Sequence, residues 1–310
     1  MKSFTGYKGV VLAVVILPLL ATVLAIVLLW QRVVHVSDLV LLAVMYSLVA
    51  LGVTVGFHRM LTHRSFRPNA VVKFVLLVLG SMSLEGPALD WAAIHIKHHA
   101  HSDREGDPHS PLEGFFHAHI GWMLGDGTID PNVYCRNLVN DRMVVFVSRT
   151  FLLWVVLSLA IPFAIGGWTG LLWGGLVRIF LTHHVTWSVN SVCHTFGKRE
   201  FPTNDRSHNE WIVGLLGFGE GWHNNHHAFP RSAFHGLHWW QFDLSGYVIW
   251  SLERLGLAKE VYRIPATLLA RRSTPQRGCM ADKEKKRMTL KNNCVASVTN
   301  CDQVHSIVQK

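Results

Sequence analysis

The residues of this chain that are best suited to chemistry are histidines, which stand in two boxes of the pattern H-x-x-H-H. The boxes are His95, His98 and His99, and His223, His226 and His227. In a helix, positions i, i+3 and i+4 share one face. We therefore expect each box to aim three imidazoles at one point, and the fold to join the two boxes in one metal site.

Three more histidines and one amide extend this set. His58 and His63 follow a long apolar segment, and Asn190 stands four residues before His194. Imidazole suits zinc, copper, iron and nickel, and nine imidazoles are too many for one ion but fit two, with a position left for water or oxygen. In a continuous α-helix His58 and His63 would be about 140° apart. We therefore expect that helix to end with the apolar segment, and Asn190 to hold a metal-bound water.

Acidic residues stand near the boxes but not inside them. A carboxylate that accepts the second N–H of a ligating imidazole fixes its tautomer and orientation. The acids expected in this role are Asp90, Asp103, Asp107 and Glu220.

The composition indicates a membrane protein. Half of the 310 residues are apolar and 16% are charged. The five cysteines include no C-x-x-C pair, which favours reduced thiols facing the cytosol. Residues 271–310 carry nine basic and three acidic side chains, and so supply six of the nine net positive charges. Such a basic segment beside a membrane favours contact with anionic lipid rather than with nucleic acid.

Four apolar segments are expected to cross the membrane as two helical hairpins. They are residues 10–30, 39–57, 144–165 and 171–189, and residues 166–170 form the second turn. The first segment has 21 residues without a charge, enough for about 30 Å of hydrocarbon. The fold class expected is an all-α integral membrane protein, in which a cytosolic helical cap holds a di-metal site.

The side of the membrane follows from the basic residues. Lysines precede the first segment and three arginines follow the second, so the N-terminus and the His58/His63 pair are expected in the cytosol. Residues 70–84 are also apolar. If they crossed, His58 and His95 would face opposite sides, so we expect an interfacial helix there.

The remaining polar stretches complete the domain plan. Residues 58–142 and 190–260 are expected to form the cytosolic caps of a membrane domain over residues 1–270. The basic tail 271–310 is expected to be disordered, with the C-terminus in the cytosol.

Four ordered motifs resemble those of one enzyme family. The order H-x-x-x-x-H, H-x-x-H-H, N-x-x-x-H and H-x-x-H-H, with flanks such as Asp107-Pro108-His109 and Gly219-Glu220-Gly221-Trp222-His223, is similar to the membrane fatty acyl desaturases of the acyl-CoA (stearoyl-CoA, delta-9) type. The resemblance covers about residues 10–260. The sequence around and after the second H-x-x-H-H box resembles that of bacterial and plant members most.

The resemblance implies a function and its cofactors. It implies a centre of two iron ions that uses O2 and two electrons to place a cis double bond, at delta-9, in a saturated acyl chain. Animal acyl-CoA members tend to carry arginine two positions before the second box, whereas Ala93 stands here. The carrier expected is therefore CoA or a lipid. The sequence has no H-P-G-G heme motif, so we expect no fused heme domain and a separate ferredoxin, rubredoxin-like protein or cytochrome with its reductase as donor.

Other readings of these residues were weighed. A di-iron membrane hydroxylase or ketolase would share the boxes but add oxygen to the chain. A metal transporter would place ionisable residues along several membrane helices, whereas the first two apolar segments carry none. A bacterial cytoplasmic membrane is favoured over the endoplasmic reticulum. The other histidines are expected at the interface or behind the ligands: His101, His109, His117, His119, His183, His184, His208, His235 and His238.

Overall fold

The computed structural model describes residues 4–30, 34–125 and 129–273. The chain divides into two units, Met1–Ile264 and Pro265–Lys310. In the second unit, helix α13 (Ala266–Ser273) includes the first three residues of the predicted disordered tail, which corrects the prediction there. Residues 274–310 of that tail lie outside the described residues.

Helices make up most of the first unit, in agreement with the predicted class. Its longer elements are α1 (Phe4–Trp30), α2 (Val36–Leu51), the π-helix η1 (Gly52–Thr62), α8 (Phe151–Gly170), the π-helix η4 (Leu171–Val177) and α9 (Arg178–Ser191). Its shorter helices are α3 (Ala70–Ser81), α4 (Ala88–His101), α5 (Phe115–His119), α6 (Pro131–Tyr134), α7 (Arg142–Arg149), α10 (Trp211–Leu216), α11 (His223–Ala228) and α12 (Leu244–Arg254), with 3-10 turns η2 (Pro111–Glu113) and η3 (Gly121–Leu124). Strands β1 (Arg67–Pro68) and β2 (Ala258–Lys259) form a short antiparallel pair.

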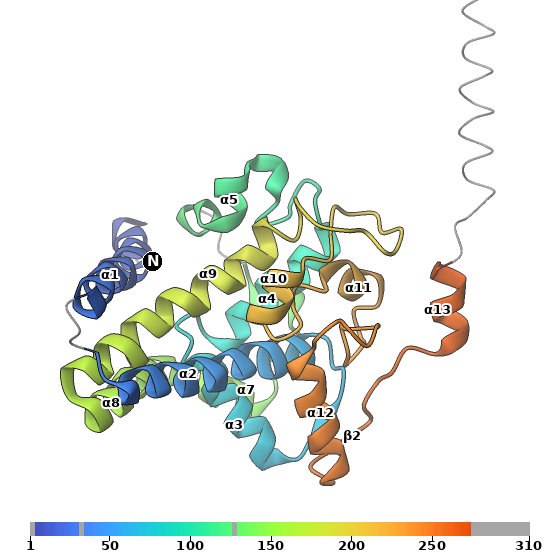
Figure 1. Ribbon diagram of the computed structural model, residues 1–310. Coiled ribbons are helices and arrows are strands. Elements are labelled where there is room, and N and C mark those ends of the chain that lie inside the picture. Colours follow the sequence, from blue (N-terminus) through green and yellow to red (C-terminus); the bar gives the residue numbers. More distant parts are fainter. Residues whose placement is uncertain (1–3, 31–33, 126–128, 274–310) are drawn as a thin grey trace, which may run out of the picture. The chain divides into compact units, whose positions relative to one another are not determined.

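Three helical segments of the described chain are long and apolar enough to cross a membrane. They are Lys8–Leu29, Val36–Thr62 and Phe151–Ser191. The second is longer than the predicted 39–57, because η1 continues α2 without a break through His58 to Thr62. In Figure 1, α2 and α9 cross the first unit together, and α4, α10 and α11 gather towards one end of them.

The third segment contains both predicted spans of the second hairpin. It has 41 residues, and its helical path is interrupted at Gly167, which has φ +60° and ψ −142°. Beyond Gly167 the chain folds back, since Arg178 donates from Nη2 to the carbonyl of Ser158, 20 residues earlier. A positive φ favours glycine, so the sharp turn falls at one of the glycines of the predicted turn.

The predicted start of the third span at residue 144 is wrong. Residues 142–149 form the separate helix α7, and the apolar segment begins only at Phe151. The break falls at Thr150, which leaves the helical conformation with ψ +17°. Val144 and Val147 are fully buried in the protein core beside α3 and α4, so their apolar character serves packing.

Polar side chains define where the short helices begin. The carboxylate of Asp141 accepts hydrogen bonds from the backbone N–H groups of Met143 and Val144 at the start of α7. Asn69 and Asp243 cap α3 and α12 in the same way. A capping side chain satisfies N–H groups that have no partner inside the helix. A helix is present at the predicted 70–84 as α3, which ends at Ser81, and its position at the membrane interface stays a prediction.

Helix η1 lies against α3 at backbone distance. A side chain at Gly52 would overlap the backbone of Leu79 and Gly80, and one at Gly56 would lie 2.8 Å from the carbonyl oxygen of Leu76. The ring of Phe57 packs on Gly80 in return. This close packing positions the first histidine pair relative to the shorter helices.

We expect Gly52→Ala to lower the free energy of unfolding by about 1–3 kcal/mol, because the added methyl group would force η1 away from α3. Thermal unfolding of the purified protein in detergent measures the change. Gly9→Ala is the control, since nothing lies within 4 Å of its added carbon. Equal melting temperatures for Gly52→Ala and the unchanged protein would contradict this account of the packing.

Candidate metal centre

The first histidine pair is aligned by the π-helix. The N–H of His63 donates to the carbonyl of His58 at 3.1 Å, an i→i+5 bond, and the ring centroids lie 4.8 Å apart. In a π-helix, residues five apart are neighbours along the axis. The expected helix end at residue 57, where the apolar segment stops, is therefore wrong, because η1 runs on to Thr62 and His63 is its C-cap residue. The helix widens instead of ending, and so keeps the two imidazoles together.

The two H-x-x-H-H boxes each divide between two groups of histidines. From α4, His95 and His99 join one group and His98 joins the other. The expectation that each box aims three imidazoles at one point is therefore wrong. Residues at i and i+4 are closer in direction than the residue at i+3, which diverges enough to reach a second centre.

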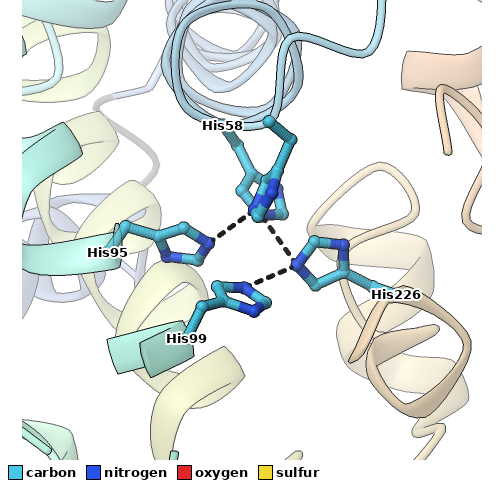
Figure 2. Close-up of side chains that lie close together, drawn as sticks. His58, His95, His99 and His226 are labelled. Carbon is cyan, nitrogen blue, oxygen red and sulfur yellow. Dashed lines mark hydrogen bonds between the residues drawn. The ribbon is translucent and has the colours of Figure 1, made fainter. Parts of the chain in front are cut away.

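All nine predicted histidines lie in these two groups. The five-histidine cluster contains His58, His63, His95, His99 and His226. The four-histidine cluster contains His98, His194, His223 and His227. Within each cluster the ligand atoms lie within 4.8 Å of one another, which is suitable for holding one metal ion. Figure 2 shows the rings of His58, His95, His99 and His226 turned towards a common point.

The spacing of the nitrogen atoms fits metal ligation. In the five-histidine cluster the Nε2 atoms of His63 and His95 are 3.0 Å apart, and those of His99 and His226 are 2.9 Å apart. In the four-histidine cluster the Nε2 atom of His223 lies 3.0 Å from that of His227. Two nitrogens bound at right angles to one ion at about 2.1 Å would be about 3.0 Å apart. The donors therefore fit a shared ion in each cluster.

The two clusters are in contact with each other. The ring of His99 stacks on the ring of His227, with centroids 4.5 Å apart and an angle of 24° between the planes. His98 and His99 are also sequence neighbours, one in each cluster. Two ions held here would be close enough to act as a pair.

A carboxylate stands behind one imidazole in each of four cases. The Nδ1 atom of His58 lies 2.5 Å from Glu220. His98 is paired with Asp107 at 2.9 Å, and His194 with Asp103 at 2.8 Å. His227 is paired with Asp205 at 2.9 Å. An Nδ1–H donated to a carboxylate leaves Nε2 free for a metal.

The acid behind His227 was missed by the sequence analysis. Asp205 lies in the loop before α10, 22 residues from His227, and no fixed spacing links the two. Asp103, Asp107 and Glu220 stand behind ligands, whereas Asp90 is exposed on the first turn of α4. Asn190 is half-buried in α9, four residues before His194, and its role stays a prediction.

Burial favours the neutral form of six of the nine cluster imidazoles. Burial first, and then the charges of neighbouring groups, lower the pKa of six of them well below the usual value for histidine: His63, His95, His99, His223, His226 and His227. Burial alone would raise the pKa of Glu220, but the charges of His58 and Arg59 outweigh it and lower that pKa. The site thus presents neutral ligands backed by charged carboxylates, which is the form that binds a cation.

An ion-pair network fixes the base of the five-histidine cluster. Arg59 is fully buried, and its guanidinium contacts both Glu220, at 3.2 Å, and Asp243, at 2.9 Å. Because Asp243 also caps α12, one arginine joins η1 to the C-terminal part of the unit. Removing one partner of such a buried network leaves an unpaired charge, which costs about 3–5 kcal/mol.

Two cavities reach the clusters. One of about 320 Å³ touches ligands of both clusters. Its lining consists of Thr62, His63, Ile96, His99, Asp205, His227 and Pro230. Another of about 420 Å³ reaches the four-histidine cluster at His194, beside Phe115, Arg199 and Arg206.

Comparison with known proteins identifies the family. The model of the fatty acid desaturase family matches residues 37–244, which include all nine histidines of the clusters. This chain belongs to the fatty acid desaturase family. The resemblance seen in the sequence is confirmed, and the enzyme is an oxidoreductase of acyl chains.

Individual relatives agree with this family. A hex-5-enoyl-[acyl-carrier protein] acetylenase of Moorena producens is 39% identical over 79% of this chain and 83% of its own length. An sn-1 stearoyl-lipid 9-desaturase of Synechocystis is 40% identical over 72% of this chain and 71% of its own. An acyl-CoA C20 Delta5-desaturase of Anemone leveillei is 40% identical over 71% of this chain and 72% of its own.

Acidification should destabilise the metal-free desaturase. Histidines in the unfolded chain have pKa values near 6.5, whereas the six cluster histidines with a lowered pKa bind protons only at lower pH. Below about pH 6.5 the unfolded chain therefore binds more protons than the folded one. Each such histidine then contributes up to about 1.4 kcal/mol of lost stability per pH unit. The stability is fully present above about pH 7.5 and is lost as the pH falls.

The measurement is the melting temperature of chelator-treated protein at pH 7.5, 6.5 and 5.5. His223→Phe should reduce the slope, because one of the shifted groups is gone. His238→Phe should leave it unchanged, because that side chain is 48% exposed. A melting temperature that stays constant or rises on acidification would contradict the assignment of neutral buried imidazoles.

Proposed function

We propose that this desaturase introduces a cis double bond, at delta-9, into a saturated acyl chain carried on CoA or a lipid. Two iron ions, when bound in the histidine clusters, would supply the oxygen activation that removes the two hydrogens. The substrate would give up two hydrogen atoms, an external donor would add two electrons and the solvent two protons, and O2 would be reduced to two waters. The donor is a separate ferredoxin, rubredoxin-like protein or cytochrome with its reductase.

The observation that carries this proposal is the division of nine imidazoles into five and four. Imidazole is a ligand for iron, and the nitrogen spacings near 3.0 Å suit one ion in each cluster. We assign the five-histidine cluster to one iron and the four-histidine cluster to the other. Asn190 then holds a water that completes the shell of the second iron.

The protein side chains would orient these ligands and keep their tautomers fixed. Asp107 and Asp103 hold His98 and His194 by their Nδ1 atoms, so both rings present Nε2 to the same ion. Glu220 does the same for His58. Asp90, on the first turn of α4, would also fix the tautomer of a ligating imidazole, as the sequence analysis proposed.

The delta-9 position and the carrier are the finer parts of the proposal. Relatives are named as 9-desaturases of stearoyl-lipid in Synechocystis and Anabaena variabilis. Other relatives are named for acyl-CoA. Ala93, which stands where animal acyl-CoA members tend to carry arginine, is fully buried, so this position offers no charge to a carrier.

The fatty-acid methyl ester profile of a host that makes the protein tests this function. We expect a new cis-monoene with its double bond at delta-9, and its loss in His98→Ala and in His226→Ala, because each variant removes a ligand from a different cluster. His238→Ala is the matched control and should keep the product. A hydroxy acid instead would favour the membrane hydroxylase, and an unchanged profile with iron bound and donor supplied would refute the acyl-chain reaction.

We also propose four membrane spans, with both termini and the metal centre in the cytosol of a bacterium. The apolar segment Phe151–Ser191 folds back at Gly167 and would cross twice. His58 and His95 meet in one cluster, so the chain between them cannot end on the other side. The basic residues around His58 favour the cytosol for that side.

Alkaline phosphatase fusions in a bacterial host test this topology. Fusions after residue 35 and after residue 168 should be active, because both turns would face the periplasm. Fusions after residues 69, 141 and 264 should be inactive, and green fluorescent protein at the same points should give the opposite pattern. An active fusion after residue 141 would rule out this arrangement of spans.

A further inference from the structure

A tenth imidazole lies against the five-histidine cluster without belonging to it. His235 stands in the loop between α11 and α12 and is 1% exposed. Among the described residues, neither of its ring nitrogens has a hydrogen-bond partner. A buried imidazole with an unpaired N–H is unfavourable, so this ring needs a reason to lie there.

The backbone around His235 is held on both sides. Its N–H donates to the carboxylate of Asp243 at 2.7 Å, and its carbonyl accepts from the side-chain amide of Asn225 at 2.9 Å. Asp243 is itself paired with Arg59. These two backbone hydrogen bonds therefore hold the loop in the position that directs the His235 ring inwards.

The ring of His235 lies close to a carboxylate oxygen of Glu220 that is already paired with His58. Nδ1 of His235 lies 3.6 Å from Oε2 of Glu220, and the same oxygen lies 2.5 Å from Nδ1 of His58. The other oxygen of Glu220 accepts from Arg59. The His235 ring also lies 4.6 Å from that of His226 and 5.4 Å from that of His58, centroid to centroid.

We propose that His235 is a positioning residue for the iron of the five-histidine cluster. In the iron-loaded centre its Nδ1–H, which lies 3.6 Å from Oε2 of Glu220 in this structure, would donate to that oxygen and so fix the carboxylate that orients His58. A carboxylate oxygen can accept two hydrogen bonds, and this one would satisfy the only N–H of the neutral ring. The nitrogens of His235 lie with those of His58 and the carboxylate of Glu220, and not among the five that converge in the cluster, so we assign His235 to the carboxylate and not to the ion.

This inference rests on the proposed iron centre and assigns a role that the sequence pattern does not show. His235 lies outside the H-x-x-H-H box, eight residues beyond its last histidine. The sequence analysis grouped it with interface or outer histidines. Its neighbour in the loop, His238, is 48% exposed and pairs with Glu200, which makes His238 a matched control.

The test compares amides that mimic one ring nitrogen each. His235→Asn places an amide near the position of Nδ1 and keeps a donor for Glu220, whereas His235→Gln places it near Nε2. His235→Phe keeps the ring volume and removes both nitrogens. Each purified holoenzyme is mixed with a ferrous chelator, and the release of iron is followed by absorbance. Mössbauer spectra of 57Fe-loaded protein report the two irons separately.

We expect the release of one of the two irons to be about 10–100-fold faster in His235→Phe and in His235→Gln, because loss of such an outer partner weakens metal binding by about that factor. The Mössbauer signal of one iron should change with it. His235→Asn should release iron nearly as the unchanged enzyme does, and His238→Asn should be indistinguishable from it.

Several results would overturn the proposal. If His235→Phe releases both irons at the normal rate, or lowers only the melting temperature of the chelated protein, the ring serves packing alone. If the Asn variant already lacks one iron after purification, His235 is a ligand. Unchanged enzyme that binds no iron would refute the proposed function itself, which separates that failure from this one.

Discussion

The structure depends on keeping nine imidazoles together in two buried clusters, with their nitrogens pointing inwards. Burial and the mutual repulsion of their protonated forms lower the pKa of most of them, so the folded chain presents a set of lone pairs that only cations can satisfy. The repulsion among converging acceptor nitrogens is unfavourable until ions are bound. The surrounding contacts, above all the carboxylates behind His58, His98, His194 and His227, counter that cost by fixing each ring.

The π-helix joins the membrane part of the chain to this centre. If the apolar helix ended at the membrane surface, the histidines beyond it could shift relative to the membrane part of the chain. Here η1 continues α2, contains His58 and ends directly before His63, so the two rings lie together, while its glycines let α3 approach closely. The box on α4 gives two histidines to the five-histidine cluster and one to the four-histidine cluster, and the box on α11 does the reverse. His95 and His99 belong to the cluster that takes His226, and His98 belongs to the cluster that takes the other two histidines of α11. This exchange interlocks the clusters, so neither can be displaced without the other.

The composition of the site could be predicted from the sequence, but its geometry could not. The nine ligands and three of the four carboxylates are visible because histidine boxes have fixed local spacing. The π-helix was not predicted, because its i→i+5 bonds leave no mark in a hydrophobic pattern. Asp205 and His235 were not recognised, because loops bring them to the centre from positions with no regular separation from the ligands. Helix α7 was read as part of a span since buried packing and lipid contact both favour apolar residues.

The two clusters differ in how completely the protein surrounds them, and this asymmetry bears on the proposed reaction. The five-histidine cluster has more ligands, and Glu220, Arg59 and His235 close it from behind. The four-histidine cluster has one imidazole fewer and borders a cavity of about 420 Å³ at His194. A ligand that must exchange during turnover, such as water or oxygen, is bound most readily where the protein leaves a coordination position open. In the proposed centre, the four-histidine cluster, with Asn190 near the end of α9 and four residues before His194, is therefore the side where exchange belongs, and the five-histidine cluster is the side held more firmly.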